Sequence, residues 1–454
     1  MSLIKSISGV RGTIGGNPGQ NLTPIDIVQS TAGYAKWALT QNSNAKTIIV
    51  GRDGRISGPM VSQLAIQTLI GMGLDVIDLG LSTTPTVEMA VKTQGALGGI
   101  IFTASHNPKE WNALKFLNQE GEFISAEDGA QILSYIDSGQ ISFANVNSLG
   151  KIYTYPDAIR DHINAILALP YINQKAIADR NFSVVVDCIN STGAISIPPL
   201  LDALGVSYTL IHAEMTGNFA HNPEPLPIHM TDIIHEVAAR RADLGIVVDP
   251  DVDRLALVCE DGSLFGEEYT LVAVADYLLE LKSGNTISNL SSSRALSDVT
   301  QKYGGQYFAS AVGEVNVVKM MKEKNARIGG EGNGGVILPD LHYGRDALVG
   351  IALILSHLAK TGLSASALRA TYPNYVMIKD KMDIDSISLD QIYDKLKEKF
   401  AKERINDIDG LKIDFEEGWV HLRPSNTEPI IRIYAESKSE EEALKLINLV
   451  KNQL

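Results

Sequence analysis

A serine follows an apolar run in the string Thr103-Ala-Ser105-His106-Asn-Pro. The run, residues 97–102, has the composition of a buried strand. Because α/β proteins bind ligands beyond the carboxyl ends of such strands, Ser105 is a candidate nucleophile with His106 beside it. The alternative is an ordinary loop serine in front of an Asn-Pro turn.

Three aspartates alternate in the string Asp249-Pro-Asp251-Val-Asp253-Arg254, directly after the apolar run 244–248. Alternate side chains of an extended segment point to one side, so the carboxylates converge. Each close pair would repel by about 4 kcal/mol at an effective dielectric of about 20 unless a cation lay between them. Carboxylates with open positions suit Mg²⁺ and a phosphate oxygen, and Arg254 is placed to bind another oxygen of that phosphate.

Other classes of protein use similar acidic strings. An EF-hand loop also has alternating aspartates and ends in a glutamate, as Glu260 would, but Arg254 stands where that loop needs glycine. A phosphatase with an aspartyl nucleophile would use this segment and leave Ser105 without a role. A solvated acidic turn is the remaining alternative.

A glycine-rich string, Gly-Gly-Glu331-Gly-Asn333-Gly-Gly335, occupies residues 329–335. Its spacing satisfies the dinucleotide-binding pattern, but that pattern needs a helix directly afterwards. Here Val-Ile-Leu-Pro follows, which indicates a strand, and no Lys-Ser/Thr pair of a nucleotide phosphate loop is present. The string therefore predicts either a plain turn or a loop that presents Glu331 and Asn333 to a ligand.

A fourth loop, Arg423-Pro-Ser425-Asn426-Thr427-Glu-Pro, lies between two strand-like runs, and Arg432 follows on the second of them. Hydroxyl groups, an amide, backbone N–H groups and an arginine on a tight turn can hold an anion. The same residue types also favour an ordinary hairpin turn.

The elements that position these loops fall into two patterns. Over about the first 370 residues, β-branched runs alternate with amphipathic helical stretches, which is typical of α/β domains. The remainder alternates strands with helical stretches at 389–402 and 440–451 and predicts a small α+β domain. Polar residues 138–149 and a segment near 361–364 are expected linkers.

Composition restricts the partners of the protein. A net charge of −14 over 454 residues argues against a nucleic-acid partner, which needs clustered Lys and Arg, but not against one phosphorylated small molecule. No apolar run reaches about 18 residues, so no membrane span is expected. Cys188 and Cys259 each follow a strand-like run and are expected to be buried, reduced thiols of a cytoplasmic protein. Nothing in the sequence indicates an oligomeric state.

The four loops, in this order, resemble those of the α-D-phosphohexomutases, which transfer a phosphoryl group between C6 and C1 of a sugar. Two smaller strings agree, Ser8-Gly-Val-Arg11-Gly and Asn112-Ala-Leu-Lys115. The resemblance implies that Ser105 carries the phosphoryl group, with Arg11, His106 and Lys115 as further catalytic groups. A lysine near a metal and arginines is expected to have a lowered pKa and to move a proton at neutral pH.

The resemblance also assigns the binding residues. Mg²⁺ would be held by Asp249, Asp251 and Asp253 together with Ser105. The glycine-rich loop would bind the sugar, and residues 423–427 would hold the phosphate that is not transferred. Substrate contacts are then expected from Arg254, Glu331, Asn333, Arg423, Ser425, Asn426, Thr427 and Arg432.

The sugar loop departs from the family pattern, because Asn333 replaces a serine and Gly335 replaces a histidine. His342 and Arg345 downstream are the candidates to compensate for the lost histidine. His162, His212 and His221 have no metal-ligand spacing and are expected to be structural or exposed.

The fold implied is three related α/β domains with mixed sheets and a smaller α+β C-terminal domain around a central cleft. The expected domains are residues 1–148 with the serine loop, 149–253 ending in the metal loop, 254–367 with the sugar loop, and 368–454 with the phosphate loop.

The implied activity interconverts hexose 6-phosphate and hexose 1-phosphate through a phosphoserine and a sugar bisphosphate, which also serves as activator. Glucosamine 6-phosphate is the preferred substrate hypothesis, because an Asn-Gly pair also occurs in this loop of acetylated amino-sugar mutases. Mannose or glucose phosphate is the alternative sugar. A metal-dependent sugar phosphatase and a catalytically inactive sugar-phosphate binder are alternatives from other classes.

Overall fold

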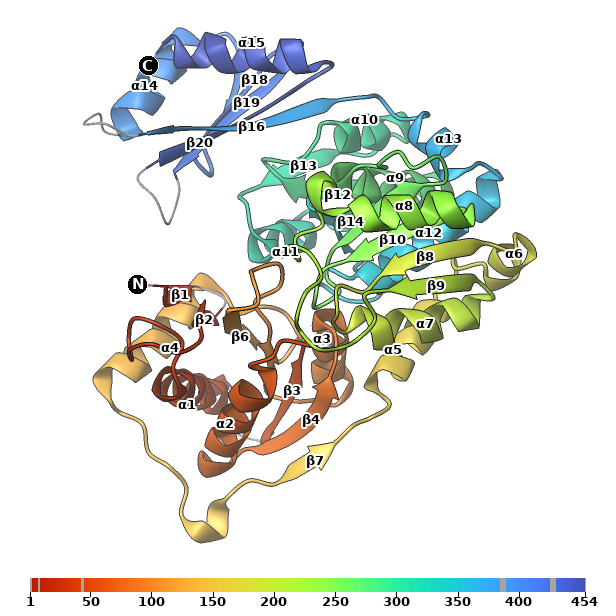
Figure 1. Ribbon diagram of the computed structural model, residues 1–454. Helices are drawn as coiled ribbons and strands as arrows, with labels where there is room; N and C mark the ends of the chain where they lie inside the picture. The colour runs from red at the N-terminus through yellow and green to blue at the C-terminus, as the bar shows by residue number, and fades with distance from the viewer. Residues whose placement is uncertain (1, 7–8, 42–44, 384–388, 425–429, 454) are drawn as a thin grey trace. The chain divides into compact units, whose positions relative to one another are not determined.

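The computed structural model describes residues 2–6, 9–41, 45–383, 389–424 and 430–453, with the side chains of residues 6 and 383 left out. In these residues the chain forms four sheets, each with helices packed against it (Figure 1). The chain divides into two compact units, Met1–Thr270 with Asn333–Ala367, and Leu271–Gly332 with Leu368–Leu454.

The first sheet carries the serine loop. Its strands are β1 (Ile4–Ser6), β2 (Gly9–Thr13), β3 (Thr47–Arg52), β4 (Asp75–Leu81), β5 (Gly98–Phe102), β6 (Trp111–Leu117) and β7 (Ile152–Thr154), in the order β1-β2-β6-β5-β3-β4-β7. Its helices are α1 (Pro24–Gln41), α2 (Gly58–Gly71), α3 (Thr84–Thr93) and α4 (Ala126–Ser138). Strand β3 is parallel to β4 and β5, whereas β6 is antiparallel to β5 and β2, so the sheet is mixed.

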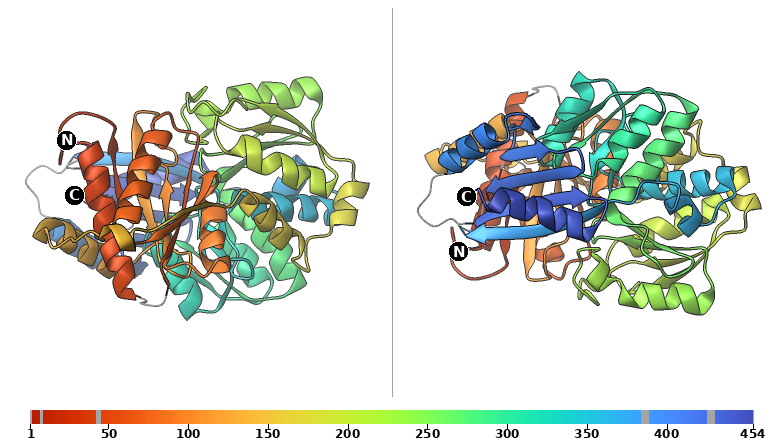
Figure 2. Two further views of the ribbon diagram at one scale, coloured as in Figure 1. Left: turned by 90° about the horizontal axis from the view of Figure 1, so that it is seen from below. Right: turned by 90° about the horizontal axis from the view of Figure 1, so that it is seen from above.

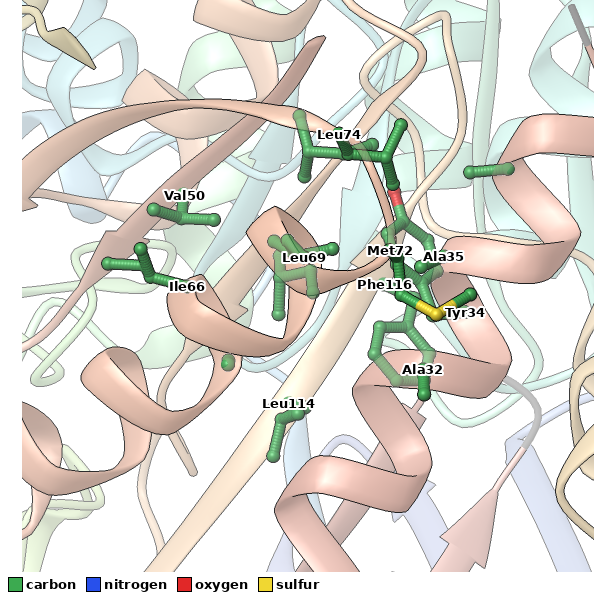
Figure 3. Close-up of a cluster of buried hydrophobic side chains, with 14 of the residues drawn as sticks. Ala32, Tyr34, Ala35, Val50, Ile66, Leu69, Met72, Leu74, Leu114 and Phe116 are labelled. Carbon is green, nitrogen blue, oxygen red and sulfur yellow. The ribbon is translucent and has the colours of Figure 1, made fainter. Parts of the chain in front are cut away.

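The core of this domain lies on both faces of the sheet. Successive residues of β3 alternate between them, so that Ile48 and Val50 join one cluster and Ile49 joins the other. The first cluster packs against α1 and α2, where the rings of Tyr34 and Phe116 stack with centroids 4.7 Å apart (Figure 3). Full burial of one such side chain stabilises the fold by about 1.5–3 kcal/mol, which fixes the strands that end at the serine loop.

The second sheet carries the metal loop. Its strands are β8 (Ser183–Asp187), β9 (Ser207–Ile211), β10 (Leu244–Val248) and β11 (Leu255–Cys259), in the order β11-β10-β8-β9. Its helices are α5 (Ala158–Leu167), α6 (Gln174–Asp179), α7 (Gly193–Leu204) and α8 (Thr231–Arg240). Strands β10 and β11 pair antiparallel from Val248 and Leu255 outward, so the metal loop is the connection of a hairpin. The domain boundary expected at residue 253 falls inside this hairpin.

The third sheet carries the glycine-rich string. Its strands are β12 (Asn285–Asn289), β13 (Tyr307–Ser310), β14 (Ala326–Glu331) and β15 (Gly335–Ile337), in the order β13-β12-β14-β15. The helices in this part of the chain are α9 (Glu267–Leu281), α10 (Ala295–Lys302), α11 (Glu314–Glu323), α12 (Ala347–Thr361) and α13 (Ala365–Arg369). The string spans the end of β14 and the start of β15. A strand follows it and not the helix that a dinucleotide site needs, as the sequence predicted.

The fourth sheet is antiparallel and has helices on one face (Figures 1 and 2). Its strands are β16 (Val376–Asp383), β17 (Arg404–Asn406), β18 (Leu411–Asp414), β19 (Gly418–Pro424) and β20 (Ile430–Ser437), in the order β16-β20-β19-β18-β17. The helices are α14 (Leu389–Lys399) and α15 (Glu440–Lys451). The predicted α/β domains followed by a small α+β domain are thus confirmed, whereas the central cleft and the domain bounds stay predictions.

The lengths of the helices and the state of the two cysteines can be read directly from the structure. None of the helices in the described residues is long and apolar enough to cross a membrane. Cys188 and Cys259 are both buried and free of any disulfide.

Candidate active site

The serine loop connects β5 to β6 and places its serine in contact with the metal loop. Ser105 is 6% exposed and has a left-handed backbone with φ of 47°, an uncommon conformation for a residue with a side chain. Its Oγ donates to Asp249 Oδ2 at 2.6 Å and lies 3.4 Å from His106 Nδ1. The structure therefore brings two predicted loops together at the candidate nucleophile.

One buried arginine holds the shape of the serine loop. Arg55 donates from its guanidinium to the backbone oxygens of Ser105, Asn107, Pro108 and Trp111. Its Nε pairs with Asp53 Oδ2 at 3.0 Å, and Asp53 in turn accepts from Thr103. Sequence analysis missed this role, because the four carbonyls lie more than 45 residues along the chain from Arg55.

The three aspartates converge, but on a turn and not on the extended segment that the alternating pattern implied, because Val252 has φ of 59° and its N–H donates to the Asp249 backbone oxygen. Each offers one carboxylate oxygen, and these three atoms lie within 4.8 Å of one another with all three residues fully buried. Asp249 Oδ1 accepts the backbone N–H groups of Asp253 and Arg254, both at 3.1 Å, which closes the loop.

The charges on this loop are unequally balanced. Burial and the neighbouring carboxylates raise the pKa of Asp249 well above its ordinary value. Burial also opposes ionisation of Asp251, but the Lys115 ammonium 2.8 Å away holds the pKa of Asp251 below its ordinary value. Arg345 Nη2 donates to Asp253 Oδ2 at 2.7 Å.

The residues present fit a divalent cation. Among the described residues, Oδ1 of Asp251 and Oδ1 of Asp253 are buried atoms without a hydrogen-bond partner. Buried carboxylate oxygens without a partner are costly, and hard cations such as Mg²⁺ bind such oxygens. The triad could therefore hold a metal ion.

Strand β6 brings Lys115 to the aspartates. Lys115 lies 2.8 Å from Asp251 Oδ2 and 3.7 Å from Asp253 Oδ2. Burial lowers and these carboxylates raise the pKa of Lys115, and the net direction is upward. The negative charges of these carboxylates oppose the lowered pKa that was expected for Lys115, and a cation bound to the carboxylates would reduce their effect.

His106 and Arg11 complete the catalytic candidates of the first domain. Burial, aided by Arg254 and Arg345, lowers the pKa of His106 to about 2, so this ring is neutral. Arg11 is opposite Ala113 in the β2–β6 register, and Lys115 is opposite Gly9, so both cations share one face of the sheet. Burial lowers the pKa of Arg11.

The sugar-loop candidates lie in different surroundings. Glu331, at the end of β14, is 6% exposed, and its Oε1 accepts from Asn289 Nδ2 at 2.9 Å and from the Gly313 N–H at 3.2 Å. Asn333 is half-buried, and its Oδ1 accepts the Gly335 N–H at 3.3 Å. Glu331 belongs to one compact unit and Asn333 to the other.

The phosphate-loop candidates form a row of cations at one end of the fourth sheet. Ser425, Asn426 and Thr427 lie outside the described residues. Arg423 and Arg432 are directly opposite each other on β19 and β20, and Lys381 on β16 is opposite Arg432. Arg423 also pairs with Asp409 at 3.0 Å. Sequence analysis did not identify Lys381, because only the strand register reveals its place in the row.

Comparison with known proteins decides the family. Models described as Phosphoglucomutase/phosphomannomutase match residues 3–141 (alpha/beta/alpha domain I), 160–262 (domain II), 266–375 (domain III) and 379–452 (C-terminal domain). The chain belongs to the phosphoglucomutase/phosphomannomutase family. This family assignment confirms the resemblance carried by the loops.

Named relatives cover nearly the whole chain. A phosphoglucomutase/phosphomannomutase of Thermococcus kodakarensis is 34% identical over 97% of this chain and 96% of its own length. A probable phosphoglucosamine mutase of Methanopyrus kandleri is 33% identical over 97% and 95%. A phosphoglucosamine/phosphogalactosamine mutase of Sulfurisphaera tokodaii is 31% identical over 99% of each.

Solved structures show the same fold. A phosphoglucomutase/phosphomannomutase family protein of Burkholderia thailandensis superposes with a TM-score of 0.85 at 25% identity, covering 99% of this chain and 97% of that one. An N-acetylphosphoglucosamine mutase of Aspergillus fumigatus, solved with GlcNAc-6P and magnesium, has a TM-score of 0.56 at 14% identity, covering 91% and 83%.

One departure from the phosphoglucomutase/phosphomannomutase pattern has a structural counterpart. A Cβ added to Gly335 would lie 2.3 Å from Cδ of Arg345, so the arginine stem passes over this glycine. Of the two candidates to compensate for the missing histidine, Arg345 reaches the metal loop. His342 is instead buried, 3.4 Å from Glu88 and 3.3 Å from Asp346.

Two histidine clusters in this family member escaped sequence analysis. His162 Nε2 lies 2.9 Å from Asp346 Oδ2, beside His342, and all three residues are buried. His212 and His221 both pair with Asp187, at 3.1 and 3.0 Å. Their partners are up to 184 residues apart in sequence, so no local spacing could predict either cluster.

Proposed function

We propose that this member of the phosphohexomutases interconverts hexose 6-phosphate and hexose 1-phosphate with Ser105 as the phosphoryl carrier. The observation that carries the proposal is the 2.6 Å contact between Ser105 Oγ and Asp249 in the buried triad. A serine Oγ held against a cluster of three carboxylates suits phosphoryl transfer, in which positioning and charge stabilisation provide most of the catalysis.

Asp249, Asp251, Asp253 and Ser105 would hold Mg²⁺. When bound, Mg²⁺ would neutralise the charge that develops on the transferred phosphoryl group. The left-handed backbone of Ser105 and the contact of Arg55 with its carbonyl hold Oγ against Asp249 before the reaction begins, which would reduce the reorganisation that the reaction requires.

The remaining cations of the site would orient the phosphoryl group and move a proton. Arg254 is almost buried beside the triad, and its Nε has no hydrogen-bond partner within the described chain, so it is placed to bind a phosphate oxygen. Lys115, held between Asp251 and Asp253, would exchange a proton with the sugar hydroxyl, while the neutral ring of His106 and the Arg11 guanidinium would line the approach.

The cation row of Lys381, Arg423 and Arg432 would bind the phosphate that is not transferred, together with Ser425, Asn426 and Thr427. Like charges directly opposite each other on neighbouring strands are destabilising, and a phosphate would offset the positive charge that Asp409, paired with Arg423, leaves unbalanced. A bisphosphate that exposes either phosphate to this row could return the other one to Ser105, and such a bisphosphate would also act as activator.

Glucosamine 6-phosphate is the proposed substrate. Relatives named phosphoglucosamine mutase support an amino sugar, and Asn333 places an amide beside Glu331 in the sequence of the sugar loop. One hydrogen bond to a buried polar group contributes about 1–3 kcal/mol, so a preference of roughly tenfold to a hundredfold is expected. Mannose or glucose phosphate is the alternative.

The carrier role is tested by Ser105→Ala with Ser138→Ala, an exposed helix-end serine, as the matched control. Intact mass should show one added phosphate on the wild type and on the control after incubation with a hexose bisphosphate, and none on Ser105→Ala. The rate of mutase turnover should fall by several orders of magnitude for Ser105→Ala alone. Near-wild-type turnover by this variant would overturn the assignment and favour an aspartyl nucleophile.

The metal and the sugar are tested in the same assay. Thorough chelation should abolish turnover and excess Mg²⁺ should restore it, whereas activity that survives chelation would refute the Mg²⁺ site. Glucosamine 1-phosphate should give a higher kcat/KM than the 1-phosphates of N-acetylglucosamine, mannose and glucose. A tenfold advantage of mannose or glucose would replace the substrate proposal, and release of free phosphate would favour the phosphatase.

A further inference from the structure

We propose that Asp187, His212 and His221 form a second metal site, for a divalent transition metal such as Zn²⁺, distinct from the aspartate triad. Asp187 ends β8, His212 directly follows β9, and His221 lies farther along the same connection. Two imidazoles and one carboxylate form a ligand set that suits Zn²⁺, whereas Mg²⁺ prefers oxygen ligands alone.

One possible ligand atom from each of the three side chains lies within 4.8 Å of the other two. His212 Nδ1 lies 3.1 Å from Asp187 Oδ1, and His221 Nε2 lies 3.0 Å from Asp187 Oδ2. The two ring centroids are 5.5 Å apart, and the rings are inclined at 74°. Two imidazoles bound to one tetrahedral Zn²⁺ at about 2.1 Å would have their centres about 5 Å apart, so the observed separation needs little change.

The outer nitrogens of both rings have acceptors of their own. His212 Nε2 lies 3.3 Å from Asp232 Oδ2, and His221 Nδ1 lies 2.8 Å from the backbone oxygen of Asn222. If each outer nitrogen carries the proton of a neutral imidazole, the inner nitrogens present lone pairs to Asp187. Metal-bound histidines have this arrangement, in which the second nitrogen donates to a carboxylate or a carbonyl.

Lone pairs that face a carboxylate need a positive charge between them. Protons on both inner nitrogens would supply it, but they would place two imidazolium rings side by side around one buried carboxylate. A divalent cation supplies the same charge at a single point and leaves the outer hydrogen bonds intact. The backbone around the cluster is also constrained, because Ile189, Asn190 and His212 have φ of 45°, 51° and 49°.

The metal would fix a segment that packs on the serine loop. Between His212 and His221, Asn218 accepts from Lys109 at 3.0 Å, and the Phe219 ring lies 5.1 Å from the Arg55 guanidinium. Gly217 lies so close to Gly54 that an added Cβ would be 2.2 Å from its carbonyl oxygen. The cluster therefore stands at the base of a connection that covers Arg55, the residue that shapes the serine loop.

The proposal is tested by measuring Zn²⁺ binding to the intact protein. Excess Mg²⁺ is added to occupy the aspartate triad. Equilibrium dialysis should find one Zn²⁺ per chain for the wild type and a loss of at least tenfold in affinity for His221→Ala. The matched control is His235→Ala, which removes an exposed histidine of α8 in the same domain. Equal Zn²⁺ binding by the wild type and His221→Ala would overturn the proposal, as would no binding to the wild type.

Co²⁺ absorption provides a readout that does not depend on stoichiometry. Co²⁺ held by imidazole nitrogens in a tetrahedral site should give an intense visible band in the wild type and in Asp251→Asn, which alters only the triad. The band should be absent from His221→Ala and from the milder Asp187→Asn, whose fold is checked by circular dichroism. A band that is lost in Asp251→Asn and kept in Asp187→Asn would assign the metal to the triad and refute the second site.

Discussion

At the scale of single residues, Gly335 leaves room for the stem of Arg345. Because the arginine stem occupies the space over the glycine, even a methyl group at residue 335 would displace it from Asp253. We expect Gly335→Ala to lower kcat/KM by about tenfold or more, equivalent to about 1.4 kcal/mol. Steady-state kinetics measure the effect.

The control for this prediction is Gly71→Ala at the end of α2. An added Cβ there meets only Phe143, at an ordinary 3.5 Å, and alanine favours a helix. Gly71→Ala should therefore keep wild-type kinetics. Unchanged kinetics for Gly335→Ala would show that Arg345 has no role in turnover.

The raised pKa of His342 predicts that the stability of the fold depends on pH. Burial opposes its charge, but Asp346 and Glu88 raise the pKa of His342 to about 9 from an ordinary 6.5. A raised pKa stabilises the fold fully below pH 6.5, and this contribution is lost as the pH rises through about 9. At about 1.4 kcal/mol per pH unit the contribution is about 3 kcal/mol.

Urea unfolding of the wild type and of His342→Gln measures this contribution. The difference in unfolding free energy should be largest near pH 6 and should shrink toward pH 10. Exposed His235→Gln should show no such trend. A difference that is constant over this range would mean that the ring of His342 is neutral throughout.

At the scale of elements, the serine loop depends on the guanidinium group of Arg55, which a lysine ammonium cannot replace. Arg55 has donors for four carbonyls and for Asp53, whereas a lysine has three donors on one atom. Arg55→Lys leaves buried acceptors unsatisfied, at about 1–3 kcal/mol each. We expect a loss of about 3 kcal/mol or more in unfolding free energy and a marked fall in kcat.

Exposed Arg160, paired with Asp157, provides the control. Arg160→Lys should change the unfolding free energy by no more than about 0.5 kcal/mol. Thermal melts compare the two variants directly. Equal stability of both variants would contradict the structural role assigned to Arg55.

At the scale of the whole molecule, the two compact units have separate cores and are expected to unfold separately. Trp37 is buried in the first unit and Trp419 in the second. Chains with several domains commonly violate two-state behaviour. In urea, fluorescence of a variant that keeps only Trp37 should give a different midpoint from one that keeps only Trp419.

The remaining tryptophans are replaced by phenylalanine in each variant, and far-UV circular dichroism of both variants provides the reference. The dichroism curve should span both midpoints. Coincident fluorescence and dichroism transitions in both variants would show that the two units unfold together.

The order of the domains and the candidate residues of the main loops could be predicted from the sequence. The run 244–248 is buried on both faces, so it is apolar throughout, and β10 has the predicted bounds. The three aspartates that follow could be grouped from neighbouring residues alone, although they converge through a turn at Val252, whose φ is 59°, and not through an extended segment. Ser105 could be proposed for the same reason, from the strand before it and the turn after it.

Which distant residues meet became visible only in the folded chain. Packing and strand register between segments far apart in sequence bring Arg55 to the serine loop, Arg345 to Asp253 and Lys381 beside Arg432. Long-range contacts of this kind leave no periodic signal, because each partner has the composition of an ordinary loop or strand residue. His212 and His221 illustrate the limit, since neither shows a ligand spacing until β8 brings Asp187 between them.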